Sequence, residues 1–145
     1  MIPGMPADVE LASAASELRI VLGQLVRRLR TENALPTSHM AVLSRLDRAG
    51  PQTTSGLAAA ERMRPQSMAQ TLTDLRNDGL VDRTPDPVDR RQILVELTAS
   101  GRACLAAERR RREGWLTQAI TDELSPAEQK LLVNAVALLR RLAEA

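Results

Sequence analysis

The chain has 145 residues, 43% of them hydrophobic, which fits one domain with a core of its own. Its 20 basic residues nearly balance its 18 acidic ones, and Trp115 is the only aromatic residue, which excludes the stacking platforms of single-strand and RNA binders. No apolar run is long enough to cross a membrane, residues 1–8 contain no signal-peptide pattern, and a single cysteine excludes an internal disulfide. We therefore expect a cytoplasmic protein without membrane association.

A long helix is predicted over residues 9–32, because leucine and alanine recur there at alternating spacings of four and three. The positions form a heptad seam made of Leu11, Ala15, Leu18, Leu22, Leu25 and Leu29. Such a seam packs either inside its own domain or against a second copy of the chain.

Two shorter helices are predicted next. Residues 34–38 interrupt the first helix and offer a cap for the second, which ends near Gly50. A third helix then runs to about Arg62, and its cap is one of Thr53, Thr54 and Ser55. Hydroxyls and free N–H groups at this helix start suit a phosphate oxygen, although the hydroxyls suit a cap alone equally well.

A fourth helix is predicted over residues 65–78, since Pro65 suits a first turn and Gly79 a left-handed closing residue. Its apolar stripe is Met68, Leu72 and Leu75. The opposite face is polar and mostly uncharged, and it carries Gln66, Gln70, Thr73, Asp74 and Asn77. Amide and hydroxyl side chains can bond base edges in a major groove, and the first half of such a helix enters the groove. The candidate base-reading residues are therefore Gln66, Ser67 and Gln70, with Arg64 and Thr73 nearby.

A hairpin is predicted after this helix, with strands over residues 80–84 and 92–97 and a proline-rich turn between them. An arginine at its tip could enter a minor groove. Net charge does not support DNA binding, because residues 53–98 contain six arginines and seven acidic residues. A DNA-binding role therefore depends on where the arginines lie and not on the net charge.

A long helix is predicted over residues 99–119. Its four consecutive arginines, Arg109 to Arg112, circle the helix and so cannot all face one partner. They form either a solvated surface run or, for one or two of them, phosphate contacts. Cys104 lies among alanine and leucine, where we expect a small buried hydrophobic residue.

The last helix begins at a capping box, in which Ser125 is the cap, Pro126 follows it and Glu128 closes the box. It has a broad apolar face made of Leu131, Leu132, Ala135, Val136, Leu138, Leu139 and Leu142. The two terminal helices together carry more apolar surface than the small central lobe can bury, which favours a second copy of the chain as their partner.

Catalytic and metal motifs are not found. His39 is the only histidine, and neither it nor Cys104 stands in a nucleophile, phosphate-loop or metal-ligand spacing. We expect no enzymatic activity, no cofactor and no metal.

The chain resembles the MarR family of bacterial transcriptional regulators over nearly its whole length. The most specific signature is the wing sequence Asp86-Pro87-Val88-Asp89-Arg90-Arg91 followed by Leu97-Thr98 and Gly101. Weaker matches are Leu57-Ala58, Leu75 and Asp78-Gly79-Leu80-Val81 in the helix-turn-helix region.

The resemblance implies a single, mostly α domain over residues 1–145 with a small antiparallel β wing. A winged helix-turn-helix lobe, residues 37–98, binds double-stranded DNA, and the helical regions 9–32 and 99–145 form a homodimer. The function implied is sequence-specific binding of a pseudo-palindromic operator, as a repressor. The alternative is a winged-helix module that binds protein with the same surface; Arg90 and Arg91 favour DNA.

The resemblance also assigns residues. It places the minor-groove arginine at Arg91, with Asp89 bracing it by an ion pair. Arg64 stands where the family more often has a small capping residue, so a phosphate or base contact by Arg64 is open.

Regulation by a small aromatic or phenolic anion is likewise implied by the resemblance. The binding crevice would lie between the dimerisation helices and the lobe, with Arg19 as the anion partner and His39 and Met40 as lining residues. Each residue also has a simpler interpretation, as a solvated arginine, a cap and a core methionine. The cysteine-based oxidant sensing of some family members does not carry over, because no cysteine lies near the first helix.

Overall fold

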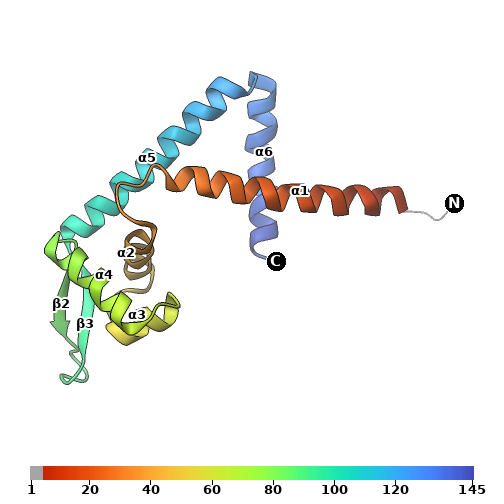
Figure 1. Cartoon of the computed structure of the whole chain (residues 1–145). Coiled ribbons are helices and arrows are strands. Elements are labelled where there is room, and N and C mark those ends of the chain that lie inside the picture. The colour runs from red at the N-terminus through yellow and green to blue at the C-terminus, as the bar shows by residue number, and fades with distance from the viewer. Residues whose placement is uncertain (1–4) are drawn as a thin grey trace.

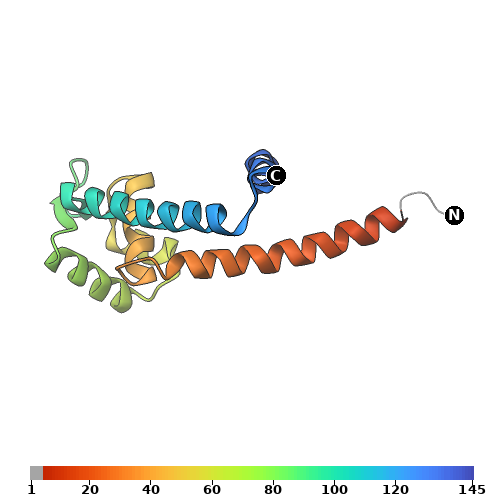
Figure 2. The ribbon, with the colours of Figure 1, turned by 90° about the horizontal axis from the view of Figure 1, so that it is seen from above.

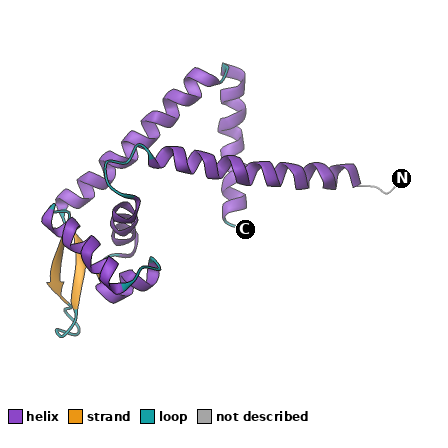
Figure 3. Ribbon diagram, in the orientation of Figure 1, coloured by secondary structure: helices purple, strands orange, loops and turns teal. Residues whose placement is uncertain are grey.

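The computed structural model describes residues 5–145; residues 1–4, which belong to the segment searched for a signal peptide, lie outside the described part. The elements in chain order are α1 (Met5–Arg30), α2 (Thr37–Ala49), β1 (Gln52–Thr53), α3 (Thr54–Ala60), α4 (Pro65–Asn77), β2 (Val81–Pro85), β3 (Ile93–Leu97), α5 (Ala99–Glu123) and α6 (Pro126–Ala143). The predicted fold class, mostly α with a small antiparallel β wing, is confirmed (Figure 3).

The molecule has two parts joined by the long helix α5 (Figure 1). At one end, α2, α3, α4 and the sheet form a lobe, and at the other end α6 follows a sharp turn after α5. Helices α1 and α5 run in nearly the same direction in the view of Figure 2, but Figure 1 shows that they diverge as they extend from the lobe. None of the helices within residues 5–145 has the length and apolarity needed to cross a bilayer.

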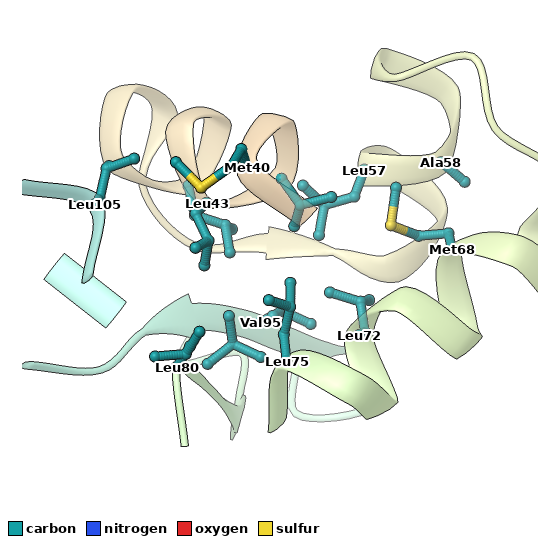
Figure 4. Close-up of a cluster of buried hydrophobic side chains, with 13 residues drawn as sticks. Met40, Leu43, Leu57, Ala58, Met68, Leu72, Leu75, Leu80, Val95 and Leu105 are labelled. Carbon is teal, nitrogen blue, oxygen red and sulfur yellow. The ribbon is translucent and has the colours of Figure 1, made fainter. Parts of the chain in front are cut away.

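The hydrophobic core lies in the lobe (Figure 4). The stripe predicted for the fourth helix is buried and meets the inner faces of α2, α3 and the sheet. The cluster consists of Met40, Val42, Leu43, Leu46, Leu57, Ala58, Met68, Leu72, Leu75, Leu80, Val81, Val95 and Leu105. Because Leu105 belongs to it, α5 is anchored in the lobe at its first turns.

The sheet contains a strand that the sequence pattern did not indicate. Its order is β1-β3-β2, with both pairs antiparallel, and Val95 on β3 lies between Gln52 and Arg83. A strand of two residues is too short for any alternation to appear, so only pairing with β3 defines β1. The wing strand β2 runs one residue later than predicted at both ends, from Val81 to Pro85.

The wing is joined to α4 and to α5 at one small junction. Gly79 has φ 75°, the left-handed conformation that ends α4. The Thr98 hydroxyl donates to the Gly79 carbonyl (2.6 Å) and accepts from Gly101 N–H (3.0 Å), while Thr98 N–H donates to the Leu80 carbonyl (3.1 Å). One threonine therefore ties the end of α4 to the start of α5.

Gly101 has no room for a side chain at this junction. A Cβ built on Gly101 would overlap the Leu80 carbonyl oxygen and lie 3.1 Å from its carbon. The Leu-Thr-x-x-Gly pattern thus has a physical reason, in which threonine supplies the cap and glycine permits the close approach.

The terminal helices differ from the lobe in burial. No residue of α6 is buried, although its Ser125–Glu128 capping box is present as predicted. Large apolar side chains stand exposed on α1 and α6: Val9, Leu11, Ile20, Val21, Leu22, Leu25, Val26, Leu131, Val133, Val136, Leu138 and Leu142. The predicted ends were inexact, since α1 spans residues 5–30 instead of 9–32 and α5 continues to Glu123.

We predict that Gly101→Ala destabilises the protein by about 3 kcal/mol, because the added methyl group must displace the Leu80 backbone. Gly114→Ala is the matched control on the same helix, where no atom lies within 4 Å of the added Cβ; it should stabilise by about 0.5–1 kcal/mol. Urea denaturation at equal protein concentration measures both changes. Equal effects of the two substitutions would contradict the proposed close approach.

Candidate nucleic-acid interface

Helix α4, the candidate recognition helix, turns its polar face to solvent. The buried residues Met68, Thr71, Leu72 and Leu75 fix its rotation against the lobe. The opposite face is exposed and contains Arg64, Gln66, Ser67, Gln70 and Thr73, the residues nominated from the sequence. In the ribbon, α4 and the wing lie at the end of the molecule away from α6 (Figure 1).

The start of α4 has no side-chain cap. Arg64 occupies the cap position with extended backbone (φ −65°, ψ 144°), and its side chain makes no capping hydrogen bond. Pro65 follows at the first helical position. The Arg64 side chain is therefore exposed and not engaged in capping.

The start of α3 is capped by Thr53. Its hydroxyl oxygen accepts from Gly56 N–H at 3.0 Å and lies 3.3 Å from the Ser55 hydroxyl. Of the three hydroxyl residues at this end, Ser55 is exposed, whereas Thr53 and Thr54 are half-buried. The sequence left the cap open among the three, and the structure assigns it to Thr53.

A polar cluster connects α2 to the middle of α4. Asp74 accepts a hydrogen bond from the Gln70 side-chain amide at 2.9 Å, and its other oxygen lies 3.5 Å from His39 Nε2. The Ser38 hydroxyl lies 3.3 Å from His39 Nδ1. Asp74 accepts from only one of the two amide N–H groups of Gln70, which leaves the Gln70 carbonyl oxygen and the second N–H for other partners. Sequence reasoning did not find this cluster, since Asp74 appeared only as one polar residue among several.

The wing tip is organised by two aspartates. The Asp86 carboxylate accepts from Val88 N–H at 2.9 Å. The Asp89 carboxylate accepts from Arg91 N–H at 3.1 Å and pairs with Arg91 Nε at 3.3 Å. The expected Asp89–Arg91 ion pair is thus present, while the Arg91 side chain is 92% exposed and Arg90 is exposed as well. The guanidinium is oriented by Asp89 and still accessible.

The arginine run on α5 is partly used inside the molecule. Arg109 pairs with Asp47 on α2 at 3.0 Å, and Arg111 pairs with Glu108. Glu108 is fully buried and also accepts from Ala34 N–H at 3.0 Å, which ties the α1–α2 loop to α5. Neither interpretation of the run included such ion pairs. The acid directly before the arginines was the only sequence signal for the buried pair.

The three residues nominated for an effector lie in different surroundings. Met40 is 5% exposed and belongs to the lobe core, and His39 faces Asp74. Arg19 is exposed on α1. None of the three lines the groove of about 650 Å³ that lies between α1, α5 and α6. That groove is lined mostly by apolar residues, including Leu25, Trp115, Leu116, Ile120, Leu124 and Leu132.

Cys104 is half-buried and packs against the core cluster. Burial raises the pKa of its thiol, and the nearby Glu108 carboxylate raises it further. The thiol is therefore kept in its less reactive protonated form.

Comparison with known proteins places these features in a family. The sequence profile described as the MarR family matches residues 35–93. An HTH-type transcriptional regulator of Mycobacterium leprae is 37% identical over 134 residues, which cover 90% of this chain and 93% of that protein.

Solved structures of transcriptional regulators share the fold of this chain. A transcriptional regulator from Pseudomonas aeruginosa is 38% identical, covers 94% of this chain and 97% of its own, and superposes with a TM-score of 0.78. A mutant of Staphylococcus aureus MepR bound to an oligodeoxyribonucleotide shares the fold, with a TM-score of 0.67, 18% identity and coverage of 89% and 97%.

Proposed function

Because this chain belongs to the MarR family of DNA-binding transcriptional regulators, we propose that it is a cytoplasmic homodimeric repressor that binds a pseudo-palindromic operator. Regulators of this family bind DNA operators, are typically dimers and are not enzymes. Two features of the structure together support the proposal. Helix α4 exposes a face that carries glutamine side chains, and Asp89 holds the exposed Arg91 guanidinium at the wing tip.

Base readout is assigned to the first half of α4. Gln66, Ser67 and Gln70 face base edges in the major groove, with Arg64 and Thr73 beside them. Asp74 accepts from one of the two amide N–H groups of Gln70, so the Gln70 carbonyl oxygen and its second N–H can form the bidentate pair with adenine.

Contacts to the DNA backbone and to the minor groove are proposed on either side of α4. The hydroxyls of Thr53, Thr54 and Ser55 lie at a helix start, where phosphate oxygens are bound favourably. At the wing, Arg90 and Arg91 are exposed and suit a narrow minor groove, whose negative potential attracts arginine. A DNA duplex would thus contact both the start of α3, through its phosphates, and the wing tip, through its minor groove.

Dimerisation is supported by the exposed apolar side chains of α1 and α6. These faces would remain in water in a single chain, whereas a second copy would remove them from it. A two-fold dimer presents two α4 helices, and each reads one half-site when their centres lie about 34–36 Å apart.

We predict that selection from a random duplex pool yields a two-fold symmetric consensus with half-sites about one DNA turn apart. Gln70→Ala should change the preferred base at one position per half-site, because a base contact carries sequence information that a phosphate contact lacks. Ser55→Ala is the control, because Ser55 is exposed and does not cap α3, and it should weaken all duplexes alike. An unchanged consensus with Gln70→Ala would place the helix in a different register on the groove.

The wing supplies a second prediction. Arg91→Ala should weaken operator binding by about 1–3 kcal/mol, and Asp89→Ala should cause part of that loss by releasing the guanidinium. Arg91→Lys, which keeps the charge but not the planar donor fork, separates general attraction from specific contact. Fluorescence anisotropy at moderate salt measures each variant. Wild-type affinity in Arg91→Ala would remove the wing from the interface.

Release of DNA by a small aromatic or phenolic anion is proposed from the family resemblance, with Arg19 as the charge partner and His39 and Met40 as lining residues. An effector acts only if it prefers a dimer whose half-site spacing does not fit the operator.

Titration of salicylate into the protein–DNA complex should therefore release DNA, and Arg19→Ala and His39→Ala should require more of the anion. Each variant is first tested for DNA affinity without the anion, because His39 also contacts Asp74. Equal release from the wild type and both variants would exclude Arg19 and His39 as the site. No release from any of them would mean that the regulator answers to another signal or to none.

A further inference from the structure

The turn between α3 and α4 contains a residue in an unfavourable backbone conformation. Among the described non-glycine residues, Arg62 alone has positive φ, at 53°. Met63 N–H donates to the Ala58 carbonyl at 2.9 Å and Arg62 N–H to the Ala59 carbonyl at 3.3 Å. This is a Schellman motif with arginine at the left-handed position, where glycine is usual.

The same lobe contains the usual form of that motif. At the end of α4, Leu80 N–H donates to the Leu75 carbonyl at 2.9 Å and Gly79 N–H to the Arg76 carbonyl at 3.0 Å. Gly79 takes the left-handed position there with φ 75°. The two helix ends thus share one closing geometry, and only the end that opens into the recognition helix carries a strained residue.

The charges around this turn leave the arginine without an acidic partner. Glu61, the neighbouring acid, pairs with Arg45 of α2, which also donates to the Ala60 carbonyl at 3.5 Å. Arg62 and Arg64 are exposed and take part in no ion pair among residues 5–145. Met63 between them is half-buried and packs against the core cluster. Two uncompensated guanidinium groups therefore flank an anchored residue directly before α4.

We propose that Arg62 binds a phosphate of the operator backbone, and that the strained turn is retained because arginine is needed there. The inference deepens the proposed function and rests on it. Base edges are reached by the first residues of a recognition helix, so a guanidinium in the turn before that helix meets the phosphates at the edge of the groove. The alternative partner for the Arg62 and Arg64 guanidinium groups is an acidic protein surface.

The test uses Arg62→Gly and Arg62→Lys in the full-length protein. Arg62→Gly should raise the melting temperature by about 2–6 °C, because glycine adopts positive φ without strain. It should also bind the selected operator and a scrambled duplex about 3–10-fold more weakly, with the slope of log K against log salt reduced by about 0.9, the contribution of one phosphate. Arg62→Lys keeps the positive charge and should retain most of the salt slope without the gain in melting temperature.

Gly79→Ala is the matched control for strain, since no atom lies within 4 Å of the added Cβ and only φ is unfavourable. It should lower the melting temperature by about as much as Arg62→Gly raises it. Operator affinity and salt slope unchanged in Arg62→Gly, while Arg91→Ala still weakens binding, would overturn the Arg62 inference and leave the proposed function standing. Failure of the wild-type protein to bind any duplex would overturn both.

Discussion

The junction at Thr98 determines how the DNA-binding surface is assembled. Its hydroxyl joins the last turn of α4 to the first turn of α5, and Gly101 lets the Leu80 carbonyl approach without a side chain between them. The wing starts from Val81, directly after this point, and returns to it through Leu97. The angle between the recognition helix and the wing therefore depends on a few backbone contacts, and so does the placement of the Arg91 guanidinium relative to Gln70.

Charge in this protein acts through placement and not through its sum. Arg45 and Arg109 are paired with carboxylates of other segments and hold those segments together, whereas Arg111 pairs with Glu108 of its own helix. The arginines of the proposed interface are instead exposed at the α3–α4 turn and at the wing tip. A near-neutral protein can thus present positive charge where a duplex would lie.

Much of the surface could be predicted because helix rotation follows from the apolar stripe. Once Met68, Leu72 and Leu75 are buried, the exposure of Gln66 and Gln70 follows from the 3.6-residue period. The Asp89–Arg91 ion pair was predicted from the family resemblance, and both of its residues lie in one short turn. Contacts between distant segments were not predicted, and the buried Glu108 receives its bond from Ala34, 74 residues away. No local pattern reports a partner that far along the chain.

Sequence by itself determined the helices, the wing hairpin, the family that the chain resembles and the polar face of the helix that we propose reads DNA, since these depend on residue types and their spacing along the chain. The tertiary structure decided the strand β1, the cap at Thr53, the joining of Gln70 to His39 through Asp74 and the conformation of Arg62. These features require atoms from different segments, or a backbone angle that packing imposes on a residue which would not adopt it alone.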